Sequence, residues 1–330
     1  MSARVRLALA LIAACAGWTA ACAAPGETAP LSLERTIALP GVTGRIDHMA
    51  VDLKRGRLLV AEVGAGGLDQ IDLGSGVRLH RVEGLEEPQG VAFLAALDQV
   101  AVANGGDGSV RFYRADDLAP VGAVQVKGDA DNLRVFARTG QLVVADGDGL
   151  SLIDPARRVV VGAISLRAHP EGFQIDQASG RAYVNMPGQR RIAVVDLVGR
   201  REVGSWPTGA LFANYPLALS GGTVAAVFRA PPRLLVIDAA SGRTVTNAGA
   251  CGDSDDAHFD ERRRRLYVTC GAGVVEAFTE TGGAYRSLGR IATRDGARTA
   301  LFVPELDRLF VAARARGGSE AAVLVLRPTG

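Results

Sequence analysis

A pattern of about 42 residues repeats along most of the chain, and its clearest part is a short apolar run opened by a polar residue. Arg57-Leu-Leu-Val-Ala-Glu and Gln141-Leu-Val-Val-Ala-Asp are two examples. Seven such runs begin at Arg57, Gln99, Gln141, Arg181, Thr223, Arg265 and Arg308. Runs this short, rich in β-branched residues and separated by Gly, Asp and Ser, are typical of strands joined by tight turns.

A second apolar run follows about ten residues after each of the first five runs, and it ends in an acidic residue. These turn acids are Asp72, Asp116, Asp154, Asp196 and Asp238. Short acidic side chains bond the backbone of tight turns, so one residue type repeated at one place indicates a scaffold role.

Four short strands per repeat and seven repeats predict an all-β protein, a seven-bladed β-propeller of the YVTN/WD40-like type. The last repeat ends one strand short, whereas residues 33–39 form a lone strand before the first repeat. Pairing residues 33–39 with residues 322–326 would remove two open sheet edges, because each edge would then have a partner. We therefore expect one propeller domain over residues 31–330, closed by its N-terminal strand.

Residues 1–24 have the pattern of a secretory signal peptide, with Arg4 and Arg6 before an apolar run and small residues. Cys15 and Cys22 each follow small residues, as the lipidated cysteine of bacterial lipoproteins does. We predict lipidation at Cys22, with Cys15 as the other possible site and cleavage without lipidation as the alternative. Residues 25–30 would then be a tether. The chain is expected in the periplasm or on the cell surface, and contact with a membrane is expected only through the lipid anchor.

Composition and charge narrow the class of partner. The chain is 48% hydrophobic, 22% charged and 5% aromatic, which is a globular composition. After removal of the signal segment, basic and acidic residues balance, so there is no basic surplus to favour nucleic acid. We expect a monomer that binds a small molecule or a protein and no nucleic acid.

Several strings resemble a known family. Arg181-Ala-Tyr-Val-Asn and Arg265-Leu-Tyr-Val-Thr resemble the repeat of the YVTN family of β-propellers. Other strings resemble a secreted, YncE-like subfamily: GRIDH (44–48), EPQGVA (87–92), NGGDGSVR (104–111), GDADN (128–132), HPE (169–171), ARTALFVPEL (297–306) and RGG (316–318). The resemblance covers residues 31–328 and implies a seven-bladed propeller outside the cytoplasm. It implies a binding platform and no particular reaction.

The repeats also predict where a binding site would lie. The residue that enters each innermost strand changes type from repeat to repeat, reading Asp47, Gln89, Asp131, Glu171, Tyr215, Asp255 and Arg298. With their neighbours Arg45, His48, Asn132, His169 and Asp256, these residues should form a ring around the mouth of the central channel. The ring would be acidic, interrupted by Arg45 and Arg298. Varied polar residues indicate recognition of a ligand; the alternative is that they are solvated and cap turns.

Metal binding is a further possibility at this ring. His48, His169 and His258 are expected on one face, and with Asp255 or Asp256 they could hold Zn²⁺ or another transition metal. They belong to three separate repeats, so their spacing does not decide the question. The identity of any cofactor therefore stays open, with a divalent metal as the candidate.

Two functions follow from this interpretation. The first is a binding module that recognises a small ligand, a metal or a partner protein at the channel mouth. The alternative is a metal-dependent hydrolase of the lactonase type at the same place, which would need an open metal position and a carboxylate base. A quinone-dependent dehydrogenase is disfavoured because Trp206 is the only tryptophan after the signal segment. We favour binding over catalysis.

Cys251 and Cys270 are the only cysteines after Cys22, and export makes oxidation available. Cys251 precedes the inner strand of the sixth repeat and Cys270 follows its antiparallel second strand, which should bring both to one place. We predict a disulfide between them; two separate buried thiols are the alternative.

Overall fold

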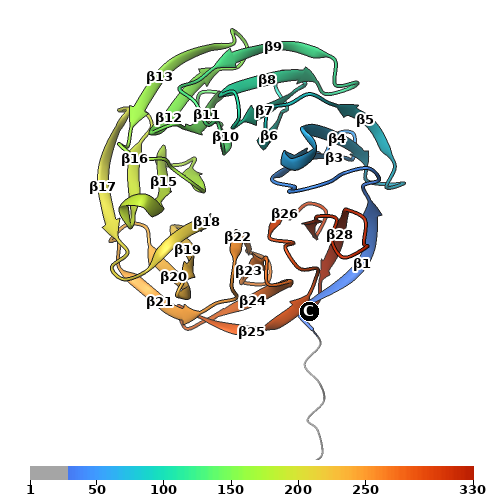
Figure 1. The fold of residues 1–330 in the computed structure, drawn as a ribbon. Helices are drawn as coiled ribbons and strands as arrows, with labels where there is room; N and C mark the ends of the chain where they lie inside the picture. The colour runs from blue at the N-terminus through green and yellow to red at the C-terminus, as the bar shows by residue number, and fades with distance from the viewer. Residues whose placement is uncertain (1–28) are drawn as a thin grey trace, which may run out of the picture.

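The computed structural model describes residues 29–330, and within them it is a ring of seven antiparallel four-stranded sheets (Figure 1). From the axis outward, blades 1 to 4 contain Met49–Asp52 (β2), Arg57–Glu62 (β3), Gly67–Asp72 (β4) and Arg78–Val82 (β5); Pro88–Leu94 (β6), Gln99–Asn104 (β7), Ser109–Arg114 (β8) and Pro120–Gln125 (β9); Leu133–Phe136 (β10), Gln141–Asp146 (β11), Gly149–Asp154 (β12) and Val159–Ser165 (β13); and Phe173–Asp176 (β14), Arg181–Met186 (β15), Arg191–Asp196 (β16) and Arg201–Pro207 (β17).

Blades 5 to 7 contain Phe212–Ser220 (β18), Thr223–Ala230 (β19), Pro232–Asp238 (β20) and Thr244–Gly249 (β21); Ser254–Asp260 (β22), Arg265–Cys270 (β23), Val274–Thr281 (β24) and Ala284–Ala292 (β25); and Thr299–Val303 (β26), Arg308–Ala313 (β27), Ala322–Pro328 (β28) and Leu31–Ala38 (β1). Two single-turn 3₁₀ helices, Val63–Ala65 (η1) and Pro187–Gln189 (η2), complete the elements. The predicted fold class is therefore confirmed.

The N-terminal strand closes the ring as the repeat count predicts. β1 pairs antiparallel with β28, with Ile37 opposite Val323 and Leu33 opposite Leu326, and the two strands lie side by side in Figure 1. The Leu39 amide extends the ladder by donating to the Ala321 carbonyl at 2.8 Å. Since β1 is the outermost strand of blade 7, it covers an edge that would otherwise expose unpaired backbone groups.

The hydrophobic core is divided among the spaces between blades. Seven apolar clusters each join two neighbouring blades; one of them packs Phe136 of blade 3 against Phe173 of blade 4, and both rings are almost fully buried. Burying a side chain of this size contributes roughly 1.5–3 kcal/mol, so adjacent blades hold each other in place. The innermost strands are thereby fixed around the axis, and the loops that precede them have fixed positions at its mouth.

The repeated turn acids act as scaffold groups on the outer turns. Asp72 Oδ1 accepts the Ser75 amide at 2.7 Å, and Asp238 Oδ1 accepts the Ser241 amide at 2.8 Å. Asp154 and Asp196 make the equivalent bonds. One residue type thus serves one turn in four blades, as predicted; in blade 2 the predicted Asp116 does not, and Asp117 accepts the Ala119 amide at 3.0 Å instead.

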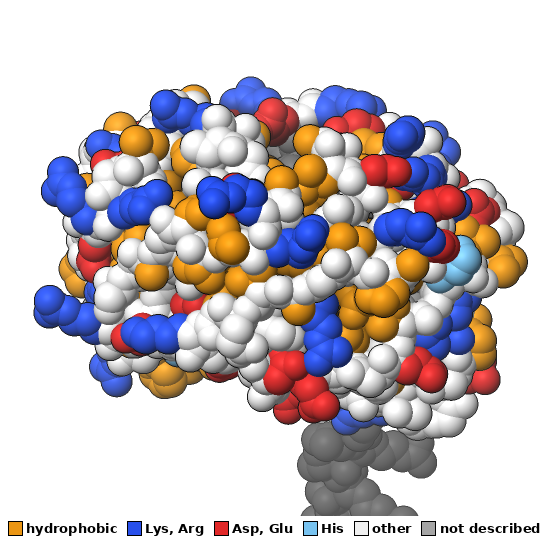
Figure 2. Space-filling model, turned by 90° about the horizontal axis from the view of Figure 1, so that it is seen from above, with side chains coloured by type: hydrophobic (Ala, Val, Ile, Leu, Met, Phe, Trp, Pro, Cys, Tyr) orange, Lys and Arg blue, Asp and Glu red, His pale blue; other side chains and the backbone are white. Residues whose placement is uncertain are grey.

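On the outside of the ring, the face shown in Figure 2 carries basic, acidic and apolar side chains interspersed with one another. No described helix is both long and apolar enough to cross a membrane.

Candidate functional site

A cavity of about 420 Å³ lies at one mouth of the channel, and all seven blades supply residues to its wall. All eleven residues predicted to bind a ligand line this cavity: Arg45, Asp47, His48, Gln89, Asp131, Asn132, His169, Glu171, Asp255, Asp256 and Arg298. The structure therefore brings together residues more than 250 positions apart in the chain. Their role in ligand binding stays a prediction.

Repeated backbone geometry sets the wall of the cavity. Glu87, Asp129, Ala213, Asp253 and Gly296 occupy the same place in five blades, and each has a positive φ. Gly90 allows blades 2 and 3 to approach: its amide donates to the Asp131 carbonyl at 2.9 Å, and a Cβ there would lie 2.5 Å from that oxygen. Five of the seven innermost strands are thus entered through a similar turn, and the side chains on these turns differ.

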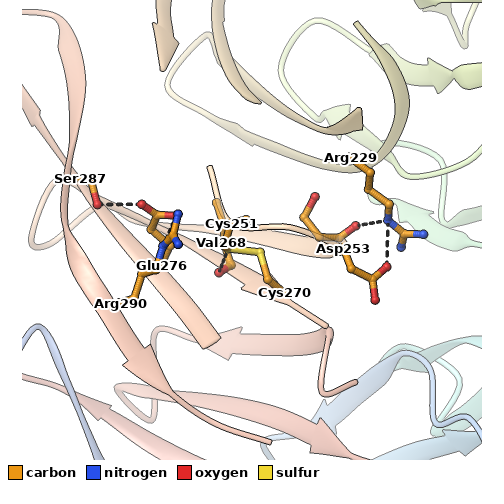
Figure 3. Close-up of a disulfide and its surroundings, with 9 residues drawn as sticks. Arg229, Cys251, Asp253, Val268, Cys270, Glu276, Ser287 and Arg290 are labelled. Carbon is orange, nitrogen blue, oxygen red and sulfur yellow. Dashed lines mark hydrogen bonds and ion pairs between the residues drawn. A yellow bond between two sulfur atoms is a disulfide. The ribbon is translucent and has the colours of Figure 1, made fainter. Parts of the chain in front are cut away.

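Along one side of the cavity, arginines and acids lie close enough to neutralise one another. Blades 5, 6, 7 and 1 form this side, together with Gln89 of blade 2. We call Arg45, Asp47, Gln89, Arg229, Asp253, Asp255 and Arg298 the arginine side. Asp255 forms ion pairs with two arginines, with Arg229 Nη2 at 2.7 Å from Oδ1 and Arg298 Nε at 2.8 Å from Oδ2. Figure 3 shows Arg229 reaching Asp253 as well, at 3.4 Å. Burial raises the pKa of Asp255 to about 7, although Arg229 and Arg298 oppose the shift.

Two further contacts fix the arginines of this side. The Arg229 guanidinium lies 4.1 Å from the centroid of the Tyr215 ring, a cation–π contact. Arg45 pairs with Asp47 through Nη2, which also donates to Gln89 Oε1 at 2.6 Å. The arginine side therefore holds its cations in fixed directions before any ligand binds.

His48 and Asp256 form a pair deeper in the channel. His48 Nδ1 lies 3.6 Å from Asp256 Oδ2, which also accepts the Ala300 amide at 2.8 Å. Burial acts to lower the pKa of His48, but the charges of Asp47 and Asp256 outweigh it and raise the pKa to about 9. His48 is therefore a cation at neutral pH and compensates Asp256.

Blades 3 and 4 supply a different kind of wall. We call Asp129, Asp131, His169 and Glu171 the acidic side. His169 Nε2 lies 3.9 Å from Asp131 Oδ2, and His169 Nδ1 lies 3.5 Å from Asp129 Oδ2. Among the described residues, no arginine or lysine forms an ion pair with Asp131 or Glu171, and no side chain donates a hydrogen bond to either carboxylate.

The acidic side shifts the protonation of its own members. The neighbouring Asp131 carboxylate raises the pKa of His169 to about 9. Burial, and then the charge of Asp131, raises the pKa of Glu171 to about 7. Carboxylates with a raised pKa in a cavity are frequent at functional sites, and Glu171 shares this property with Asp255 of the arginine side.

Two arginines of the wall are not predicted from the sequence. Arg134 lies on β10 and Arg229 on β19, and both line the cavity. The wall has four arginines and seven acids, so it is net acidic and interrupted by Arg45 and Arg298 as predicted, with Arg134 and Arg229 in addition. Burial lowers the pKa of Arg134. Both arginines lie within predicted strands, where we expect an arginine side chain to point to solvent, so the sequence assigns neither to the channel.

The three histidines do not gather as expected. His258 Nε2 lies 3.0 Å from the Ala300 carbonyl and lines a second cavity together with Gln174 and Phe302. His48 pairs with Asp256, and only His169 belongs to a group of three or more side chains in the described chain whose ligand atoms could reach one ion. The expected set of His48, His169 and His258 with Asp255 or Asp256 is therefore wrong; the group present is Asp131, His169 and Glu171.

A disulfide joins Cys251 and Cys270, whose Cα atoms are 6.0 Å apart (Figure 3). It ties the loop before β22 to the end of β23 and is almost completely buried. Because Asp253 and Asp255 follow Cys251 closely, the disulfide anchors the segment that supplies acids to the arginine side. The predicted lipidation site Cys22, the alternative Cys15 and the signal segment 1–24 lie outside the described residues.

Comparisons with known proteins agree on the fold alone. No protein-family model matches the chain, and no curated protein matches it. A chain in a solved structure titled "Crystal Structure of Mitotic Checkpoint Complex" is similar with a TM-score of 0.75 and 13% identity, over 92% of this chain and 96% of that chain. At this identity, the likeness supports a seven-bladed propeller and carries nothing about chemistry.

Proposed function

We propose that this chain is an exported, YncE-like propeller that binds a small, highly polar ligand in the cavity at the channel mouth. The observation that carries the proposal is the convergence of four arginines and seven acids from all seven blades on one cavity of about 420 Å³. Small-molecule sites commonly have volumes of roughly 300–1,000 Å³. The outer turns repeat one acid, whereas this wall varies its polar residues from blade to blade.

The two sides of the cavity favour a ligand with charges of both signs. Arg45 has a side chain that is 42% exposed, and Arg298 has one that is 26% exposed, so part of each guanidinium faces the cavity. Guanidinium groups bind carboxylate or phosphate oxygens in a fork. Asp131 and Glu171 on the acidic side would take a cationic group. A small zwitterion, or an anionic compound bound together with a cation, satisfies both sides.

The location and anchoring of the protein belong to the same proposal. Residues 1–24 support export, and Cys22 supports a lipid anchor that would hold a monomeric propeller at a membrane surface. The YncE-like strings at residues 44–48 and 297–306 supply residues of the cavity wall. The segments that carry the resemblance thus overlap with the proposed site.

Binding of a protein is the second candidate function. The similar chain comes from a structure of a mitotic checkpoint complex, so a propeller of this shape occurs within a protein assembly. A protein partner would cover the rim of the ring, whereas a small ligand would enter the cavity. Substitutions on the rim should therefore abolish binding of a protein, and substitutions in the cavity should abolish binding of a small ligand.

Thermal unfolding of the purified mature protein in the presence of a defined panel tests the proposal. The panel contains amino acids, dicarboxylates, amino sugars and lactones, with and without ZnCl₂. A compound at 100 times its Kd stabilises the folded state by about 2.7 kcal/mol, which raises Tm by several degrees. Arg45→Gln should abolish the rise, and Arg243→Gln, on an exposed outer turn, should retain it. A panel that leaves Tm unchanged, or a rise that survives Arg45→Gln, contradicts the proposal.

A further inference from the structure

The acidic side contains three side chains of the kinds that hold a transition metal. Asp131 precedes β10 of blade 3, and His169 and Glu171 precede β14 of blade 4. One ligand atom from each lies within 4.8 Å of the other two. Ligand atoms in a tetrahedral site with bonds of about 2.1 Å are roughly 3.4 Å apart, so rotations of these side chains would close the group around an ion.

His169 is oriented for this role by its other ring nitrogen. His169 Nδ1 lies 3.3 Å from the Gly147 carbonyl oxygen. Since a carbonyl only accepts hydrogen bonds, Nδ1 is the nitrogen that carries a proton in this contact. Nε2 then faces Asp131, and a metal ion that binds there displaces the proton from this nitrogen, whose lone pair becomes a ligand. A backbone carbonyl that fixes the ring through its second nitrogen is a usual companion of a metal-binding histidine.

Asp131 gives an independent indication that a cation belongs here. It is only 7% exposed and lines the cavity, and the one positively charged side chain that faces its carboxylate in the described chain is His169, at 3.9 Å. Buried carboxylates are normally paired, hydrogen-bonded or bound to a metal. Asp255 meets this requirement through Arg229 and Arg298, and Asp256 through His48 and the Ala300 amide. His169 is the only cationic side chain within 4 Å of Asp131 in residues 29–330.

We propose that Asp131, His169 and Glu171 bind a divalent transition-metal ion whose remaining coordination positions face the cavity. One imidazole and two carboxylates suit Zn²⁺ or a neighbouring first-row ion. Ca²⁺ would need six to eight oxygen ligands, which this group does not supply. The anionic group of a bound ligand would complete the coordination, and this part of the inference rests on the proposed function.

The metal alone is the first probe. Tag-free mature protein is treated with EDTA, dialysed and titrated with ZnCl₂ by isothermal titration calorimetry. We expect one ion per chain, and His169→Gln and Glu171→Gln should each weaken binding by about 100-fold or more, because both remove a ligand. The control is His80→Gln on the outer strand β5, which should bind as the wild type does.

A variant that loses its fold would imitate this loss, so its thermal unfolding is recorded in EDTA beside the titration. The visible absorption of bound Co²⁺ gives a second measurement, since a folded His169→Gln protein should lose the band that the wild type shows. Absence of stoichiometric Zn²⁺ binding to the wild type, or equal affinity in a folded His169→Gln protein, overturns the metal site.

The ligand panel separates this inference from the proposed function. Zn²⁺ binding without any response to the panel leaves the metal site standing and contradicts the proposed function. A panel compound that raises Tm equally in EDTA and in ZnCl₂ leaves the proposed function standing, and it contradicts the claim that the metal completes the ligand site.

Discussion

The two sides of the channel mouth have similar backbones and opposite electrostatic arrangements. On the arginine side, Asp255 lies between two guanidinium groups at 2.7 and 2.8 Å. On the acidic side, Asp131 and Glu171 are the neighbouring carboxylates of two adjacent blades, and the imidazole of His169 is their nearest cation in the described chain. The carboxylate at this position of the repeat is thus paired with arginines on the arginine side. On the acidic side it is available to a bound cation.

This difference shows that the repeated fold fixes the backbone of the inner turns but not the identity of their side chains. Close contacts between blades, such as that of Gly90 with Asp131, fix the position of each inner turn. The side chain on that turn is less constrained, because it projects into a water-accessible cavity. Loss of an acid on the arginine side should therefore affect mainly stability, and loss of an acid on the acidic side should affect mainly the binding of a cation.

The disulfide offers the largest effect on the arginine side. Replacing both Cys251 and Cys270 by Ala should lower the free energy of unfolding by about 3 kcal/mol, because it releases a short covalent loop in the unfolded chain. Urea unfolding with and without dithiothreitol measures the change, and the reductant should affect only the wild type. Zn²⁺ affinity of the folded variant should be unchanged. Equal stability of variant and oxidised wild type would show that the loop before β22 does not depend on the disulfide.

Matched Asn substitutions compare the two sides directly. Asp255→Asn should lower the free energy of unfolding by about 1–2 kcal/mol, because the loss of the carboxylate shared by two partly buried arginines outweighs the relief of the burial that raises the pKa of Asp255 to about 7. Asp131→Asn should change stability less, because no arginine pairs with Asp131 in the described chain, and the loss of its pairing with His169 is offset by weaker repulsion of Glu171. Urea unfolding at pH 7.5 in EDTA provides both values. Equal losses for the two variants would contradict the distinction between the sides.

The pH dependence of His48 gives a smaller effect. Its pKa of about 9 in the folded protein lies above its ordinary value of 6.5, because the charges of Asp47 and Asp256 outweigh burial. The protonated form is thus favoured by folding, and its stabilisation is complete below pH 6.5 and lost as pH rises through 9. Between pH 6.5 and 9.5, the wild type should lose about 1–2 kcal/mol more than His48→Gln. Identical slopes for the two proteins would mean that His48 is neutral in the folded state.

Glu171 should give the smallest change and the opposite sign. Burial and the charge of Asp131 raise its pKa to about 7, so at pH 8 its ionised form costs the folded protein free energy. Glu171→Gln should therefore stabilise the metal-free protein by about 0.5–1 kcal/mol at pH 8. Urea unfolding in EDTA detects the gain, and Glu305→Gln, on an exposed turn, serves as the control. A loss of stability would indicate that Glu171 has a structural role.

The sequence predicts the fold and the place of the site for the same reason. A constant period makes every blade equivalent, so counting repeats gives seven blades, the closing strand and the residues at the channel mouth. Pairing between side chains of neighbouring blades lies beyond that argument, because it depends on the spacing of the blades and on side-chain length. Arg229 shows this: it reaches Asp255 of the next blade from the end of β19, whereas the repeat alignment considers only residues that enter the innermost strands.

The histidines illustrate the same limit. His258 belongs to the repeat that carries Asp255 and Asp256, but it lies further along β22 and opens toward the second cavity. A shift of two residues along an inner strand thus moves a side chain from one mouth of the channel toward the other. Counting residues places each histidine in a blade, and the depth of its side chain in the channel decides what it can bind.

Anomalous X-ray diffraction from crystals of the Zn²⁺-loaded protein, collected on both sides of the zinc absorption edge, tests the central claim most directly. The account predicts one edge-dependent peak among Asp131, His169 and Glu171, with Zn–N and Zn–O distances of about 2.0–2.2 Å. A peak at Asp253 and Asp255, or diffraction without a peak at the channel mouth, would contradict it.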